Sequence, residues 1–152
     1  DMGYKCTLKI VGAIPPKNFI KPKFVRIIPF LNKKNITKLK KHYLNSDYFI
    51  LLSKAEAFGL IVQEATDTGL TLILNNIDDI RYVADKKYSL LVDRNSSPHM
   101  IASKIANLNN NISKYKKLSH NSYSSSFNNN WGFVSDKLSN VIDDIILKKK
   151  LV

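Results

Sequence analysis

The feature that most constrains the fold of this sequence is the alternation of short apolar runs with longer helical stretches. Each run has the length of a strand, whereas a stretch such as 35–44 places Ile36, Leu39 and Tyr43 on one helix face. Strands that alternate with helices form βαβ units and run parallel. The sequence therefore predicts an α/β fold with a mainly parallel sheet and flanking helices. The expected strands are 6–11, 24–28, 48–52, 71–74 and 88–92, and the expected helices are 35–44, 59–68, 77–84, 98–110, 112–122 and 131–147.

Local signals set several of the expected element ends. Asn35 has the side chain of a helix cap, Gly69 closes the helix before it, and Pro98 suits the first turn of a helix. The run 48–52 reads YFILL, and uniformly apolar runs are typical of strands covered on both faces. We therefore expect this strand to be buried, and we expect the polar stretch 124–130 to separate the last two helices.

The composition predicts a single compact domain over 1–152 in a reducing compartment. A chain of 152 residues, 44% of them hydrophobic, can bury a sizeable core. No apolar run approaches the roughly 20 residues of a transmembrane helix, and no signal peptide is visible. Cys6 stands alone, which excludes an intrachain disulfide and favours the cytoplasm. Because no βα unit precedes the first strand, we expect a fragment of a larger protein that lacks strands on its N-terminal side.

The net charge of +12 is spread unevenly along the chain. Residues 1–46 hold eleven basic residues and one acid, a balance of +10 that would attract nucleic acid, anionic lipid or diphosphate. Since 21 of the 24 bases are Lys, compositional bias explains this charge better than specific nucleic-acid binding. The run Lys148–Lys150 fits either a weak contact with the inner face of a membrane or a solvated helix end.

The best candidate site follows the strand 48–52, because open parallel sheets bind ligands at the carboxyl ends of their strands. Gly59 allows close approach of a ligand to the backbone, and the nearby N–H groups at the start of the helix would favour a diphosphate. Glu56 in the loop and Glu64 in the second helical turn border the same place, and a glutamate suits a ribose diol. Alternatively, Glu64 only favours the helix dipole and Glu56 is a solvated loop acid.

The segment from Glu56 to Ala65 reads EAFGLIVQEA and resembles the E-x-F-G-L-x-x-x-E-A signature of the group 1 glycosyltransferases, the family 4 enzymes of the GT-B fold. The resemblance covers roughly residues 6–147 in order and with similar spacing. Stretches that resemble other family motifs are IVG at 10–12, FVRIIPFL at 24–31, SDYFILLS at 46–53, GLTLIL at 69–74, SLLV at 89–92 and FNNNW at 127–131.

This resemblance implies a Rossmann-like, nucleotide-sugar-binding domain, the C-terminal half of a two-domain GT-B enzyme. Such an enzyme transfers a hexose from a UDP- or GDP-linked donor to a glycan, lipid or protein acceptor, with retention of configuration and without metal or cofactor. The missing acceptor domain would be its partner, and the fragment alone would be nearly inactive. The resemblance implies that Glu56 is catalytic and binds the sugar near its anomeric centre, and that Glu64 binds the ribose. It further implies that the sugar and diphosphate contact Ala57, Phe58, Gly59 and Leu60. The base would be lined by Phe30 and Leu31.

The sequence departs from the family pattern in places, and the altered glycine-rich turn supports a different reading, whereas the intact pair Glu56 and Glu64 argues against it. The stretch Asn75–Asp79 replaces the glycine-rich turn after the strand 71–74, and the basic pair that neutralises the diphosphate has no counterpart here. The alternative is a degenerate module that binds a sugar nucleotide or a protein partner without catalysis. The three histidines, His42, His99 and His120, are scattered and form no predicted metal site.

Overall fold

A computed structural model describes residues 5–57, 59–78, 85–127 and 131–150. The chain divides into two compact units, 1–45 and 46–152, and each is described by itself. Both contain parallel strands connected through helices or loops, which confirms the predicted α/β class. The predicted strands 6–11 and 24–28 lie in the first unit and the other three in the second, so the strands form two sheets.

The first unit holds a two-stranded parallel sheet and one helix. Strands β1 (Leu8–Val11) and β2 (Val25–Ile28) pair with Leu8 opposite Val25 and Val11 opposite Ile28. A 3₁₀ turn, η1 (Lys33–Asn35), leads into α1 (Ile36–Leu44). Asn35 stands at the cap position, as predicted, but its side chain makes no capping hydrogen bond. Its amide donates to Asn32 Oδ1 at 3.2 Å, so it stabilises the preceding turn instead.

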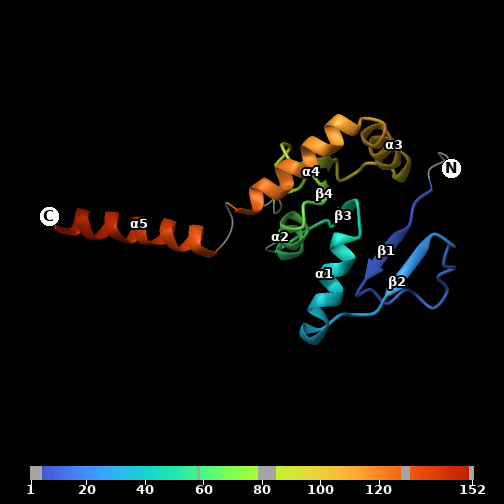
Figure 1. The fold of residues 1–152 in the computed structure, drawn as a ribbon, viewed down its shortest axis with the longest axis horizontal. Coiled ribbons are helices and arrows are strands. Elements are labelled where there is room, and N and C mark those ends of the chain that lie inside the picture. Colours follow the sequence, from blue (N-terminus) through green and yellow to red (C-terminus); the bar gives the residue numbers. More distant parts are fainter. Residues whose placement is uncertain (1–4, 58, 79–84, 128–130, 151–152) are drawn as a thin grey trace. The chain divides into compact units, whose positions relative to one another are not determined.

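The second unit is built on the three-stranded parallel sheet β3 (Tyr48–Leu51), β4 (Thr71–Asn75) and β5 (Ser89–Val92), with β4 in the middle. Helix α2 joins β3 to β4, and α4 packs against both α2 and β4 (Figure 1). The predicted strands differ from the observed ones by two residues at most. The helices of this unit are α2 (Leu60–Asp67), α3 (Pro98–Asn109), α4 (Ile112–Ser126) and α5 (Trp131–Lys150).

The core of the second unit forms around β4. All five of its residues are buried, and Leu72, Ile73 and Leu74 are fully buried. Further buried side chains come from α2, β5, α3 and α4. The prediction that β3 is equally covered is wrong: Ile50 is 43% exposed and the other β3 residues are only half-buried. The reason is position, because β3 is an edge strand of this sheet and pairs with β4 alone. These further buried side chains include Val62, Ala65, Val92, Leu108 and Leu118.

The helix ends follow the sequence signals with one exception. Gly69 ends α2 with φ of +71°, and Pro98 opens α3 behind Ser97, whose hydroxyl accepts from the Met100 N–H at 3.2 Å. Helix α4 continues beyond the predicted end at 122, since the hydroxyls of Ser125 and Ser126 donate to carbonyls three residues back instead of breaking the helix. The predicted helix 77–84 falls largely outside the described residues.

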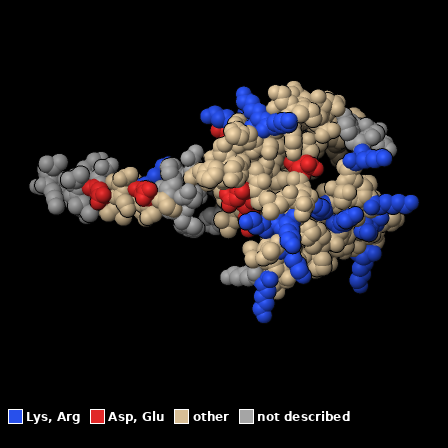
Figure 2. Space-filling view, in the orientation of Figure 1, with Lys and Arg blue, Asp and Glu red and all other residues tan. Residues whose placement is uncertain are grey.

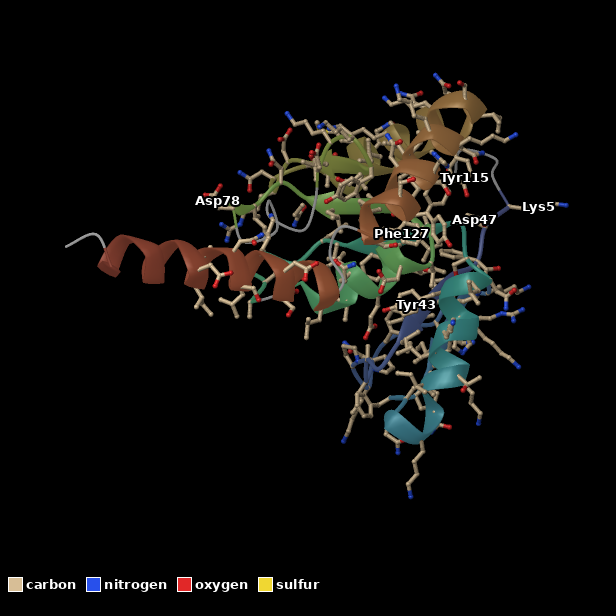
Figure 3. The ribbon with its side chains drawn as sticks, turned by 60° about the vertical axis from the view of Figure 1, so that its left-hand side comes forward. Lys5, Tyr43, Asp47, Asp78, Tyr115 and Phe127 are labelled. Atoms are coloured by element: carbon tan, nitrogen blue, oxygen red, sulfur yellow. The ribbon has the colours of Figure 1, made fainter. Side chains whose placement is uncertain are left out.

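An aromatic pair joins the start of β3 to α4. The rings of Tyr48 and Tyr115 lie 5.4 Å apart, and the Tyr115 hydroxyl donates to the Asp47 carbonyl at 3.4 Å (Figure 3). Partial burial raises the pKa of both phenols, and the negative charge of Asp47 raises them further. Burial also raises the pKa of Tyr88, beside Asp85. All three phenols therefore keep their protons to a higher pH in the folded chain than in the unfolded one.

We expect the stability of this chain to fall as the pH rises above about 10, the ordinary pKa of a phenol. Below that value both states hold these protons, so the three tyrosines add no pH dependence. Above it the unfolded chain loses protons first, which lowers the free energy of unfolding until the raised pKa values are passed. Urea unfolding at about pH 9 and pH 11 measures this change. The double variant Tyr48→Phe/Tyr115→Phe should show a smaller decrease than the parent; an equal decrease would contradict the assignment.

Replacing Gly69 by alanine should lower the stability of the chain, whereas the same replacement at Gly132 should not, because only Gly69 of these two has an αL backbone. Gly69→Ala should lower the free energy of unfolding by about 1–2 kcal/mol, because its φ of +71° is strained for a residue with a Cβ. The new Cβ would also lie 3.4 Å from Tyr123 Cβ. Gly132→Ala is the control, because this residue lies inside α5, where alanine favours the helix. Equal stability of the two variants in urea would show that the turn at Gly69 tolerates a side chain.

Candidate functional site at the carboxyl ends of β3 and β4

The candidate site is the loop that leaves β3 and enters α2. It runs from Leu52 to Gly59 at the carboxyl end of the sheet, next to the end of β4 at Asn75. Loops at this edge of a parallel sheet lead into helix N-termini and are the usual ligand sites of such folds. The loop and the start of α2 lie where the sequence places them, within the signature that resembles the glycosyltransferases, while ligand binding at this edge stays a prediction.

Gly59 shapes the start of α2. It is buried and adopts φ 60° and ψ 26°, a left-handed conformation that suits glycine. Its carbonyl accepts from the Val62 and Gln63 N–H groups at 2.8 and 3.1 Å, and Gly59, at the cap position, has no side chain with which to cap the helix. The N–H groups of Leu60 and Ile61 precede the first intrahelical hydrogen bond, so they point out of the helix end. This end carries partial positive charge and suits an anion such as a phosphate.

Glu56 lies three residues before Gly59 and is half-buried in the loop. Its Oε1 accepts from the Ala57 N–H at 3.2 Å, so the carboxylate turns back toward its own backbone. A half-buried carboxylate ahead of a helix N-terminus is close enough to the loop backbone to share a ligand with it. The predicted position of Glu56 in the loop is therefore confirmed, while its catalytic role stays a prediction.

Glu64 lies in the second turn of α2, as the sequence predicts, and its side chain is exposed. Leu60, in the first turn, is also exposed, whereas Val62 and Ala65 face the core. The exposed side of α2 thus carries the carboxylate and the apolar side chain, and its buried side holds the helix against the sheet. A carboxylate in this place can accept hydrogen bonds from a diol without disturbing the core.

Asn75 holds the loop against the end of β4, a role that sequence reasoning missed. Its side-chain amide donates to the Leu52 carbonyl at 2.9 Å and to the Ser53 carbonyl at 3.0 Å. The residue is buried, so these two hydrogen bonds take the place of those that its amide would make to water. They continue the pairing of β3 and β4 beyond the last strand residues and restrain the loop that carries Glu56. The sequence feature that could have indicated this role is the polar Asn75 at the end of the apolar strand TLILN.

The remaining predicted site residues belong to the first unit or lie outside the described residues. Phe30 and Leu31 follow β2 in the first unit; Phe30 is 77% exposed and its ring lies 3.7 Å from a Cβ built on Gly12. Their proposed contact with a nucleotide base stays a prediction. Phe58 lies outside the described residues, so its contact with the donor also stays a prediction.

Neither a metal cluster nor a membrane span is found in the described part of the chain. Within residues 5–57, 59–78, 85–127 and 131–150, no three His, Cys, Asp or Glu side chains gather in a way that would hold a metal ion. Over the same ranges, none of the helices combines the length and the apolar character needed to cross a bilayer.

Comparison with protein families identifies the chain. A model of the glycosyl transferases group 1 matches residues 8–125, a range that includes the loop, α2 and all three strands of the second unit. The chain belongs to this family. The match confirms the resemblance read from Glu56 to Ala65, and a search of curated proteins finds no match.

Solved structures support the same fold for this glycosyltransferase chain. A sucrose-phosphate synthase from Thermosynechococcus elongatus aligns with a TM-score of 0.66 and 17% identity, over 82% of this chain and 31% of that one. The C-terminal domain of a group 1 glycosyl transferase, LpcC of Francisella tularensis, aligns with a TM-score of 0.56 and 25% identity, over 67% of this chain and 51% of that one. The glycosyltransferase chain therefore spans about a third and a half of these two structures, and its fold is the Rossmann-like α/β fold of GT-B proteins.

We expect Asn75→Ala to destabilise the glycosyltransferase chain by about 1–3 kcal/mol, because the Leu52 and Ser53 carbonyls lose a buried donor. Urea unfolding measures the change. Asn76→Ala is the matched control, since Asn76 bonds to the Val92 carbonyl through its backbone N–H, which alanine keeps. If both variants unfold like the parent, the Asn75 side chain does not restrain the loop.

Proposed function

We propose that the segment from Glu56 to Glu64 binds the nucleotide-sugar donor of a retaining glycosyltransferase. The observation that carries this proposal is the N-terminus of α2, which begins behind the αL residue Gly59 at the carboxyl end of a parallel sheet. The N–H groups of Leu60 and Ile61 would meet the diphosphate, which carries the charge that a helix N-terminus favours. No cation is then needed at this position, so we propose a metal-independent reaction without a further cofactor.

The two glutamates would set the orientation of the donor in the site. Glu64, exposed on α2, would accept hydrogen bonds from the ribose diol, and a carboxylate accepts two such bonds at once. Glu56, half-buried before the helix, would bind the hexose near its anomeric carbon and act in catalysis. The backbone from Ala57 to Leu60 lies between them in sequence and would contact the sugar and the diphosphate. The donor would thus lie along the loop with its sugar toward Glu56.

The whole enzyme would transfer the hexose from a UDP- or GDP-linked donor to a glycan, lipid or protein acceptor, with retention of configuration. We propose that this chain is its donor-binding domain and that a separate acceptor-binding domain completes the cleft, since a closed cleft is needed to exclude water. Phe30 and Leu31 would line the base in that assembly. We further propose that the enzyme acts in the cytoplasm.

One observation favours a second function, a module that binds a sugar nucleotide without catalysis. Asn75 and Asn76 stand where the family has its glycine-rich turn, and the Asn75 side chain is engaged with the loop backbone. Side chains at this turn prevent the close approach of backbone to sugar that glycine allows. Donor binding without transfer by the complete protein would favour this reading.

We expect the chain to bind one nucleotide of the series UDP, GDP and ADP, and the matching hexose conjugate, in a calorimetric titration. Glu64→Ala should weaken this binding by about 1–3 kcal/mol, through the loss of charge-assisted hydrogen bonds. Its stability should change little, because the side chain is exposed. Asp67→Ala is the control: it removes an exposed carboxylate from the far end of the same helix, where Asp67 only accepts from Gln63 at 2.8 Å. Equal losses of affinity in both variants would exclude Glu64 as the ribose ligand.

A further inference from the structure

The loop between β1 and β2 combines exposed apolar side chains with lysines. This β1–β2 loop comprises residues 12–24. Ile14 and Ile20 are 94% and 90% exposed, and Phe19 and Phe24 are exposed as well. Single exposed apolar residues are ordinary, but four within thirteen positions form an unusually apolar loop. Lys17, Lys21 and Lys23 stand between these residues, and all three are exposed.

The backbone holds this loop in a defined shape. The Phe19 N–H donates to the Pro16 carbonyl at 2.9 Å, and the Val25 N–H donates to the Pro22 carbonyl at 3.0 Å. These two turns place Lys17 and Lys23 at their central positions. Since proline also restricts the backbone, a partner would meet a loop whose conformational entropy is already reduced.

The charge around the loop has a single sign. Residues 5–45, the described part of this unit, contain eleven Lys or Arg and no Asp or Glu. Figure 2 shows many Lys and Arg side chains projecting from the surface. A surface of this kind attracts an anionic partner over a distance set by the salt concentration. The partner must therefore offer negative charge together with an apolar phase for the isoleucines.

We propose that the β1–β2 loop is a membrane-contact site that inserts Ile14 and Ile20 into the interface of an anionic bilayer, while its lysines meet the lipid head groups. Stable attachment to a bilayer needs two signals, apolar insertion and a basic patch, and this loop supplies both. A nucleic acid fits less well, because the loop offers Lys rather than Arg and its most exposed apolar side chains are aliphatic and have no face for stacking. This inference does not depend on the proposed donor site.

Vesicle sedimentation with the 152-residue chain tests the proposal. The chain should sediment with vesicles made of equal parts phosphatidylcholine and phosphatidylserine, and not with vesicles of phosphatidylcholine alone. Raising the salt from about 0.1 M to about 1 M should release most of it, because the Debye length falls to about 3 Å. Failure to bind the anionic vesicles at the lower salt concentration would overturn the proposal.

Two loop variants separate the two signals. Lys17→Gln/Lys21→Gln/Lys23→Gln should lower the partition coefficient about a hundredfold, since each basic residue near an anionic surface contributes roughly fivefold. Its control, Lys114→Gln/Lys116→Gln/Lys117→Gln, removes the same charge from the exposed side of α4 and should lower it much less. Equal losses in the two triple variants would show that net charge alone drives binding.

Ile14→Ser/Ile20→Ser should lower the partition coefficient at least about tenfold, because it removes most of the apolar insertion. Met100→Ser/Ile112→Ser is its control, with two exposed apolar side chains from α3 and α4. Circular dichroism checks that all variants fold, which is expected since the replaced side chains are exposed. Unchanged vesicle binding of the isoleucine variant, or equally tight binding of the parent to polyglutamate or to RNA, would overturn the proposal in favour of a charged macromolecular partner.

Discussion

The structure of the second unit depends on the complete burial of β4. All five residues of this strand are buried, and it pairs with β3 on one side and β5 on the other, so its backbone groups and its side chains are withdrawn from water together. Burial of this kind is the largest favourable contribution to the stability of a small domain. Helices α2 and α4 pack on this strand and on each other. The position of α2, and with it the candidate site, follows from this packing.

The same constraint explains why the site can be both open and well positioned. Val62 and Ala65 hold α2 against the core, which leaves Leu60 and Glu64 exposed on its other side. At the end of β4, the side chain of Asn75 carries the strand pairing one step further and restrains the loop of Glu56. The loop 52–59 is thus positioned by three features: the edge of the sheet, the glycine that starts α2 and the buried amide of Asn75. Its own described side chains contribute little to the core. Such an arrangement is typical of sites placed on a stable scaffold.

The first unit differs from the second in having little buried apolar surface and many basic residues. Its two-stranded sheet buries few side chains, and its described residues, 5–45, include eleven Lys or Arg and no Asp or Glu. Two-stranded sheets have little stability of their own, so contacts with other surfaces contribute more to such a unit. The exposed isoleucines of the β1–β2 loop have the same origin: the loop has turns to hold its shape but no core to cover it.

The parallel strands, most of the helix ends and the position of the loop and helix that carry Glu56 and Glu64 could be predicted from the sequence alone. These features rest on local chemistry: the apolar runs, Pro98 and Gly69 at helix ends, and the segment from Glu56 to Glu64 that resembles the group 1 glycosyltransferases and matches their family model. Only the tertiary structure decided that β4 is buried while the equally apolar β3 lies at an edge, that serines extend α4, and that Asn75 restrains the loop. The physical reason is that burial and side-chain pairing depend on neighbours distant in sequence, which no local pattern specifies.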